Sequence, residues 1–253
     1  MHILLTNDDG FTSEGLLAAY SCLRSAGHRV TVCAPDRERS AQSQSITVRT
    51  PLLVMEEKLP DGETGYAVSG TPADCARLGF MTLAKDLDLL VSGINLDCNL
   101  GYDVNYSGTV AAALEAAGAG FPAIAASLEK SSRSDWPGAG AILADVIQKM
   151  PGYELPKGIM LNLNIPHSPR NLEPVWTAAC NEPALDYFSR NELSPGTSQY
   201  IRCRGYGLEL GPDSVPEKLD NDVSLIRAGY ITLSPLTKVS VHEETLRRLS
   251  GAS

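Results

Sequence analysis

The stretch HILLTNDDG, residues 2–10, decides the fold of this chain. Its apolar first half is typical of a buried strand, and the turn-forming residues 7–10 end that strand. The apolar-periodic segment 14–26 then predicts a helix, and the run 29–34 predicts a second strand that Pro35 stops. This strand–helix–strand unit favours a parallel sheet.

The same alternation continues to about residue 165. We expect strands at residues 45–56, 65–69, 87–91, 122–128 and 158–165, and helices at 72–83, 107–119 and 138–150. Beyond residue 166 the alternation weakens, with strand signals at 173–179, 198–204 and 230–234 and a final helix after Val241.

The pattern predicts an α/β fold with two parts. Residues 1–165 are expected to form a Rossmann-like, mostly parallel sheet with helices on both faces. Residues 166–253 are expected to form an extended β appendage used in oligomerisation. Because the strand signal at 230–234 has no obvious local partner, we expect residues from about 220 onward to exchange between subunits.

Composition excludes several classes of partner and compartment. The formal net charge of −9 opposes the counterion release that drives binding to long nucleic acids. A small phosphate ester stays compatible, because one bound dication inverts the local field. The six cysteines are scattered without a CxxC pair, and neither a leader segment nor an apolar membrane span is present in the sequence. We therefore expect a cytoplasmic protein with reduced thiols and no membrane partner.

Oxygen-bearing side chains follow three of the expected strands. Asp8 and Asp9 follow the first strand, residues 40–45 follow the second, and residues 95–105 follow the strand at 87–91. Taken alone, an Asp-Asp pair is most often a solvated turn. In an open parallel sheet, however, the loops after the strands converge on one crevice. The four histidines are dispersed, so such a site would be all-oxygen, which suits Mg²⁺ or Mn²⁺ better than Zn²⁺.

The helix expected from residue 107 begins with Ser107-Gly108-Thr109. A helix start of this kind presents free backbone N–H groups, hydroxyl donors and the positive end of the helix dipole, which suits a phosphate. Simple N-capping by Ser107 is the plainer interpretation. The two roles can coexist.

Five motifs in order carry a resemblance to a known family. They are ILLTNDDG (3–10), APDRERSAQSQSIT (34–47), SGTPADC (69–75), VSGINLDCNLG (91–101) and YSGTVAAALEA (106–116). Together they resemble the SurE family, the survival-protein-E 5′/3′-nucleotidases. Residues 11–14, the Asp97-Cys98 pair and residues 180–216 depart from the family pattern, and these departures concern substrate preference.

The resemblance implies a divalent cation held by Asp8, Asp9, Ser40 and Asn95, with Asp8 and Asp9 also catalytic. It further implies hydrolysis of nucleoside 5′- or 3′-monophosphates, in some members also of short polyphosphates, and a homodimer or homotetramer formed through the C-terminal region. In the mechanism that we favour, one Asp accepts a proton from the attacking water, and four residues hold the phosphate oxygens: Asn99, Ser107, Gly108 and Thr109.

Two alternatives stay open. An aspartyl-phosphate mechanism would make Asp8 or Asp9 a covalent nucleophile, but the acids are adjacent and the first three loops contain no Lys to balance the charge. A non-catalytic, nucleotide-binding regulatory module would use the same crevice without turnover.

Overall fold

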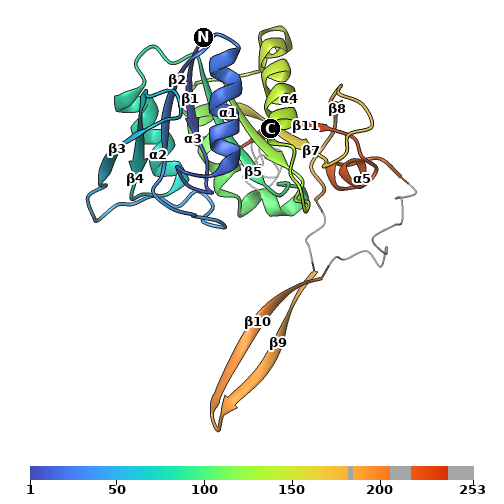
Figure 1. Cartoon of the computed structure of the whole chain (residues 1–253). Helices are drawn as coiled ribbons and strands as arrows, with labels where there is room; N and C mark the ends of the chain where they lie inside the picture. Colours follow the sequence, from blue (N-terminus) through green and yellow to red (C-terminus); the bar gives the residue numbers. More distant parts are fainter. Residues whose placement is uncertain (182–184, 206–217, 239–253) are drawn as a thin grey trace, which may run out of the picture.

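A nine-stranded sheet forms the centre of the computed structural model, which describes residues 1–181, 185–205 and 218–238 (Figure 1). In spatial order the strands are β3 (Val54–Lys58), β4 (Thr64–Val68), β2 (Arg29–Pro35), β1 (His2–Thr6), β5 (Leu89–Leu96), β6 (Ala123–Leu128), β7 (Ile159–Ile165), β11 (Thr232–Thr237) and β8 (Val175–Trp176). All neighbours from β4 to β7 are parallel, whereas β3 and β11 run antiparallel to β4 and β7. The predicted α/β, mostly parallel sheet is confirmed.

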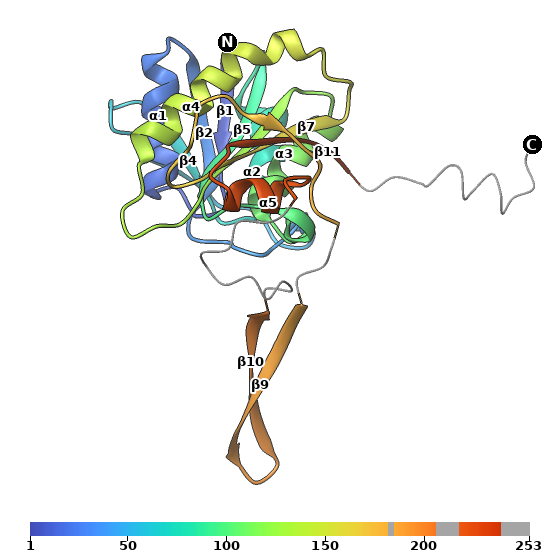
Figure 2. The same ribbon diagram turned by 90° about the vertical axis from the view of Figure 1, so that its right-hand side faces the viewer.

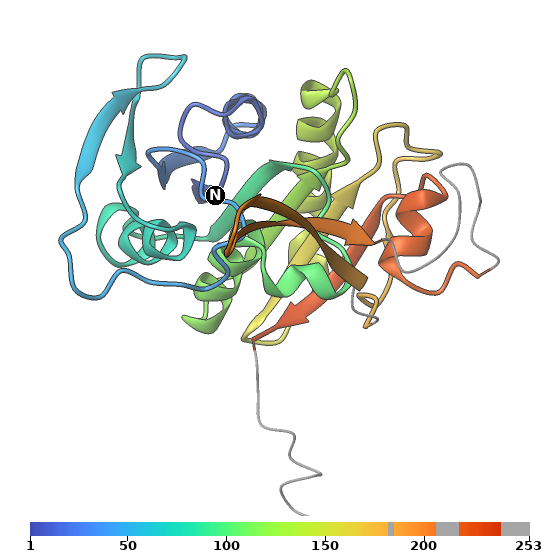
Figure 3. The same cartoon turned by 90° about the horizontal axis from the view of Figure 1, so that it is seen from below.

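Helices cover both faces of the sheet (Figure 3). The helices α1 (Glu14–Ser25) and α4 (Trp136–Lys149) share one apolar cluster with Leu5 of β1. Helices α2 (Pro72–Leu78) and α3 (Gly108–Gly118) share the opposite cluster with Leu4. Because successive strand residues point to opposite faces, a continuous apolar run in β1 fills both cores.

The helix starts follow the sequence signals. The Ser13 hydroxyl caps α1 and the Ser107 hydroxyl caps α3, where it accepts a bond from Val110 N–H at 3.1 Å. At α2 a full capping box forms, with Thr71 accepting from Asp74 N–H and Asp74 accepting from Thr71 N–H. Helix α2 then continues through a π-helical segment, Gly79–Leu83, as far as the predicted helix.

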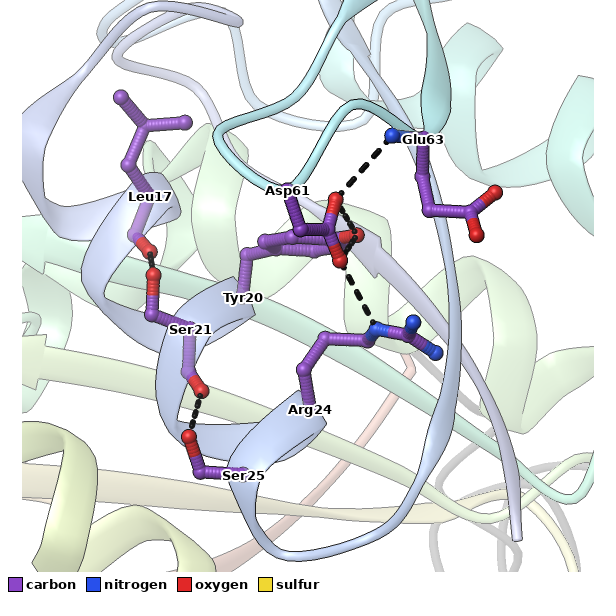
Figure 4. A network of polar contacts seen from close by, with 7 residues as sticks. All are labelled: Leu17, Tyr20, Ser21, Arg24, Ser25, Asp61 and Glu63. Atoms are coloured by element: carbon purple, nitrogen blue, oxygen red, sulfur yellow. Dashed lines mark hydrogen bonds and ion pairs between the residues drawn. The ribbon is translucent and has the colours of Figure 1, made fainter.

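A polar network joins α1 to the turn between β3 and β4 (Figure 4). The Tyr20 hydroxyl donates to both carboxylate oxygens of Asp61 at 2.8 Å, and Arg24 Nε donates to Asp61 at 3.2 Å. Burial, together with the adjacent Asp61 carboxylate, raises the pKa of Tyr20 to about 12. The network fixes the outer edge of the sheet at the end away from the polar loops.

The strand predicted at residues 45–56 is wrong over most of its length, since only β3 from Val54 is a strand. Side chains bind the backbone of residues 45–53 instead. Asp74 accepts from Thr47 N–H, the Thr71 hydroxyl donates to Ser45 O, and the Ser69 hydroxyl accepts from Leu53 N–H. These bonds satisfy the backbone without a strand ladder.

Two other strands differ in length from the prediction. Strand β5 continues to Leu96 rather than ending at residue 91, because Asn95 and Leu96 pair with β6 again after a register shift between Ser92 and Asn95. Strand β8 has only two residues where residues 173–179 were expected, because β11 pairs with it only there.

The C-terminal part confirms one predicted strand and contains elements that the sequence did not predict. The strand signal at residues 198–204 becomes β10 (Thr197–Gly205), which pairs with an unpredicted strand, β9 (Leu185–Ser194), in an antiparallel hairpin that stands away from the main sheet (Figures 1 and 2). A short helix, α5 (Asp222–Arg227), follows. The final helix expected after Val241 lies outside the described residues.

Strand β11 corrects one expectation about the C-terminal part. The signal at residues 230–234 becomes Thr232–Thr237, which pairs with β7 and β8 of its own chain. The strand therefore has local partners, contrary to the argument from sequence, because β7 is left as an open edge that β11 can complete. No helix among the described residues has the length and apolar character needed to cross a membrane.

Candidate functional site

The polar loops meet where the order of the sheet reverses. From β1 through β2 to β4 the chain adds strands in one direction, and from β5 onward it adds them on the other side of β1. Ligands of open α/β sheets bind at this switch point, outside the carboxyl ends of the strands. The loops after β1, β2 and β5 come from the three strands at this point, as the sequence predicted.

Asp8 lies deepest in the site, with 4% of its surface exposed. The Thr109 hydroxyl donates to Asp8 Oδ1 at 2.5 Å. Burial raises the pKa of Asp8 to about 6; the bond from Thr109 opposes this rise, and the neighbouring charge of Asp9 adds to it. The carboxylate is thus charged at neutral pH without a full set of donors.

Gly108 allows the start of α3 to approach Asp8. A Cβ atom at Gly108 would lie 2.9 Å from Asp8 Cβ and 2.9 Å from Pro72 Cγ, which is too close for any side chain. The structure therefore brings Asp8, Gly108 and Thr109 together, and Ser107 caps the same helix. The first turn of α3 faces a carboxylate, so a cation or a strongly held ligand is needed between Asp8 and any phosphate.

Asp9 lies beside Asp8 and is half-buried. Its Oδ2 accepts a hydrogen bond from Leu96 N–H in β5 at 3.1 Å. Burial raises the pKa of Asp9, the bond from Leu96 lowers it, and the charge of Glu38 raises it further. Two adjacent carboxylates with raised pKa values are typical of a site that holds a cation.

The loop after β2 contacts the loop after β1 and the loop after β5. Arg39 N–H donates to Asp8 O at 2.7 Å, which places the next residue, Ser40, at the site. The Ser40 hydroxyl donates to Glu38 Oε1 at 2.9 Å. Further along, the Ser43 hydroxyl donates to Asn105 O at 2.7 Å. The loop that carries Ser40 is therefore attached to the loops that follow β1 and β5.

Asn95 lies within β5, in register with Ser127 of β6. Its Nδ2 donates to Asp97 O at 2.6 Å, which leaves the side-chain carbonyl oxygen Oδ1 as the group able to bind a cation. Pairing with β6 fixes the backbone of Asn95, and Asp97, just after the strand, orients its side chain.

Asn99 is held by the strands beneath it. Its N–H donates to Asn164 Oδ1 at 2.8 Å, and its carbonyl accepts from Asn162 and Asn164. Its side-chain Nδ2 donates to Ser127 at 2.8 Å. One N–H of the amide thus bonds to the sheet, while the other is available to a ligand.

Three groups of residues near the site were missed from sequence. Glu38 is two positions before Ser40, and its charge acts on Asp9. The two asparagines of β7 alternate inside a buried strand (LNLNI, residues 161–165), a polar pattern that could have been noticed. Asp222, whose carboxylate accepts from Gly101 N–H, lies far along the chain and gave no local signal.

The donors suit a hard divalent cation. No group of three His, Cys, Asp or Glu side chains gathers in the part of the chain that the structure describes. The candidate donors are instead two carboxylates and the neutral oxygens of Ser40 and Asn95. Such an all-oxygen set fits Mg²⁺ or Mn²⁺. Burial raises the pKa values of Asp8 and Asp9, so a cation bound beside them would favour their charged forms.

The fold and the site together define a Rossmann-like α/β protein with an oxygen-lined, doubly acidic site at the switch point of its sheet. The model of the family described as survival protein SurE matches residues 3–183, and the chain belongs to the SurE family. The predicted family is therefore confirmed.

Named relatives match over nearly the whole chain. The 5′-nucleotidase SurE of Solidesulfovibrio magneticus is 43% identical over 239 residues, covering 93% of this chain and 91% of the relative. The 5′-nucleotidase SurE of Thermosipho africanus is 36% identical over 252 residues, covering 98% and 96%. The crystal structure of the SurE protein from Aquifex aeolicus superposes with a TM-score of 0.81 at 27% identity, covering 99% of this chain and 100% of that chain.

Proposed function

We propose that this chain is a divalent-metal-dependent nucleotidase that hydrolyses nucleoside 5′-monophosphates to nucleoside and phosphate. The observation that carries the proposal is the adjacent pair of Asp8, buried against the start of α3, and Asp9, half-buried beside β5. The matched relatives that are called 5′-nucleotidases support the same activity. Activity on 3′-monophosphates and short polyphosphates belongs to the same proposal.

The proposed cation ligands are Asp8, Asp9, Ser40 and Asn95, and Mg²⁺ or Mn²⁺ is the proposed metal. When bound, such a cation supplies Lewis acidity toward a phosphate oxygen and offsets the charge of the two carboxylates. We propose that Ser107, Gly108 and Thr109 present the first turn of α3 to the phosphate, and that the second amide N–H of Asn99 also donates to it.

The carboxylates also have a proposed role in proton transfer. Water attacks phosphorus, and the bond from phosphorus to the ester oxygen breaks. We propose that Asp8 or Asp9 accepts the proton of the attacking water, and that this proton then passes to the leaving nucleoside oxygen. Thr109 keeps Asp8 oriented through its hydroxyl bond.

The test is release of inorganic phosphate from a panel of nucleoside 5′- and 3′-monophosphates, with added Mg²⁺ or Mn²⁺ and with EDTA. We expect turnover of 5′-monophosphates that EDTA abolishes and that added metal restores. Nucleotide binding without phosphate release would instead identify a binding module. Phosphate release that is indifferent to EDTA would refute the metal assignment.

We further propose that the protein forms a homodimer or homotetramer through its C-terminal region. The hairpin β9–β10 exposes 64% of Phe188, 65% of Leu193 and 60% of Tyr200. A two-stranded hairpin is marginally stable alone in water, and these exposed apolar side chains would be covered by a second copy of the chain. Sedimentation of the full chain tests this proposal; a monomer at micromolar concentration contradicts it.

The remaining proposals concern boundaries and location. We propose that residues 1–165, which carry all the proposed ligands, form the catalytic part, and that the segment 166–253 serves assembly. In that segment β8 and β11 extend the catalytic sheet. The boundary at residue 165 therefore divides the chain by proposed role, although both parts contribute strands to one sheet. A cytoplasmic location is supported by the free state of all the cysteines that the structure describes.

A further inference from the structure

Two asparagines of β7 form an unusual pair in the core. Asn162 and Asn164 are both completely buried, on the side of the sheet that packs against α3, where Met160 of the same strand also lies. Burying a carboxamide is costly unless its donors and acceptor are bonded. A buried strand has no need of two such side chains, so the contacts that they make must account for them.

Both side chains bind the main chain of one residue, Asn99. Asn164 makes two bonds, accepting from Asn99 N–H at 2.8 Å and donating to Asn99 O at 3.1 Å. Asn162 donates to the same carbonyl at 2.8 Å. Since N–H groups can only donate and carbonyls can only accept, these partners also fix which way each carboxamide points.

The segment held in this way leads directly to the proposed phosphate site. The Asn99 side chain donates to Ser127, and two residues later Gly101 N–H donates to Asp222 Oδ2 at 2.8 Å. The chain then passes through a short 3₁₀ helix, Gly101–Asn105, to Ser107, which caps α3. Side chains from β6, β7 and α5 therefore fix residues 99–101, just before the turn that faces Asp8.

The proposed cation ligands do not depend on these bonds. Pairing with β6 fixes the backbone of Asn95, and Asp97, which orients the Asn95 side chain, itself donates its N–H to Leu128 O of β6 at 2.8 Å. Asp9 is held by Leu96 N–H. Loosening residues 99–101 should therefore change how the phosphate is held without changing how the cation is held.

We propose that Asn164, assisted by Asn162, is a positioning residue that holds Asn99 and the approach to α3 where they bind the phosphate of the substrate. This inference rests on the proposed nucleotidase function. Misplacing a binding group by about 1 Å costs roughly 100-fold in rate. Loss of the two hydrogen bonds between Asn164 and Asn99 is accordingly expected to lower kcat/KM by roughly 10- to 100-fold.

Thr232 offers a matched control. It lies directly across from Asn164 in the pairing of β11 with β7, and it is equally buried. Its hydroxyl has no hydrogen-bond partner among the described residues. Replacing it with valine, which has nearly the same shape, changes the polarity of the same layer without touching Asn99.

The experiment compares the full-length wild type with the variants Asn164→Ala and Thr232→Val. Steady-state kinetics with a nucleoside 5′-monophosphate are measured across a Mn²⁺ titration, and hydrogen exchange of the peptide covering residues 97–101 is followed in the same proteins. For Asn164→Ala we expect lower kcat/KM, an unchanged half-saturating Mn²⁺ concentration and faster exchange of residues 99–101. Thr232→Val should match the wild type in all three.

Each contrary result has a separate meaning. Unchanged exchange in Asn164→Ala would show that the side chain does not hold the segment, whatever the activity. Faster exchange with unchanged kcat/KM would refute the positioning role, and so would a loss of activity explained by a smaller folded fraction or by weaker Mn²⁺ binding. A wild type that releases no phosphate would refute the proposed function and with it the catalytic meaning of the contact. Restored kinetics and slow exchange in Asn164→Ser, which keeps an acceptor for Asn99 N–H, would support the inference further.

Discussion

Asp8 and Asp74 are both buried aspartates beside the start of a helix, yet their pKa values move in opposite directions. Burial raises the pKa of each. At Asp74 hydrogen bonds from Thr47 and Thr71 outweigh burial, and the pKa is lowered. At Asp8 the main opposing contact is the Thr109 hydroxyl, and the pKa rises to about 6.

The difference separates a structural carboxylate from a functional one. Asp74 accepts four hydrogen bonds that join residues 47 and 71 to α2, so its charge is satisfied by the protein. Asp8 carries a similar burial cost without similar compensation, and Asp9 adds a second charge beside it. Proteins retain such an arrangement where a ligand completes it.

The largest expected effect comes from the same substitution made at both aspartates. Asp8→Asn should reduce metal-dependent phosphate release by more than roughly 100-fold. The reason is that losing a direct cation ligand lowers activity more than losing a residue that only supports a ligand. Asp74→Asn should retain the activity of its folded fraction. Asp9→Asn is expected to behave as Asp8→Asn does. Steady-state assays at saturating Mn²⁺ check this, and near-normal turnover in both Asp8→Asn and Asp9→Asn would remove the pair from the site.

Stability should show the reverse order. Asp74→Asn replaces an accepting oxygen with an NH₂ group that faces the donors of Thr47 and Thr71, so the free energy of unfolding should fall by about 1–3 kcal/mol. Asp8→Asn relieves the repulsion with Asp9 and should leave the free energy of unfolding equal or higher in EDTA. Urea denaturation measures both. A larger loss of stability at Asp8 than at Asp74 would contradict the comparison.

The pH dependence of stability should distinguish the two carboxyls as well. The pKa of Asp8 is higher in the folded chain than in the unfolded chain, so the folded state binds the proton more tightly, and acidification through about pH 6 stabilises it. In EDTA the wild type should gain about 1 kcal/mol relative to Asp8→Asn between pH 8 and pH 5. Asp74 has a lowered pKa, so its stabilising effect is present above its unfolded pKa and is lost at lower pH, as the pH falls through its folded pKa. Parallel pH profiles for wild type and Asp8→Asn would count against the raised pKa.

The catalytic sheet could be predicted because its signals are local. The run at residues 2–6 and the alternation up to residue 165 identify strands and helices whose caps, such as Thr71 and Ser107, are also in the sequence. The elements that failed depend on distant groups. Residues 45–53 are held by Asp74 and Ser69 rather than by a strand, and β11 lies where the open edge of β7 puts it.

The candidate site likewise has a part that could be predicted from the sequence and a part that could not. Asp8, Asp9 and the start of α3 could be located from the positions of strand ends, because topology alone brings those ends together. The contacts of Asn99 with Asn162 and Asn164 could not be predicted, because these asparagines are more than sixty residues away from it in the sequence. Side-chain bonds between distant segments leave no periodic signal.

The neutral ligands should matter less than the acids. Ser40→Ala and Asn95→Ala each remove an uncharged oxygen, which water can partly replace in the coordination of a dication. The half-saturating Mn²⁺ concentration should rise by several-fold to roughly 10-fold, with less loss of activity than in Asp8→Asn. Titrating Mn²⁺ against activity measures the change. An unchanged half-saturation in both variants would exclude these residues as direct ligands.

The smallest expected effect is at Glu38. A substitution there compares a negative charge beside the site with the charges of Asp8 and Asp9 within it. Glu38→Gln keeps an oxygen for the Ser40 hydroxyl, whereas it removes a negative charge that raises the pKa of Asp9. Because Glu38 is exposed, solvent screens that charge, and the half-saturating Mn²⁺ concentration should rise only about twofold at low salt. The rise should disappear in high salt, since screening removes a long-range attraction but leaves direct coordination intact. An effect of the size seen for Asn95→Ala, or one that persists in high salt, would show instead that Glu38 binds the cation directly.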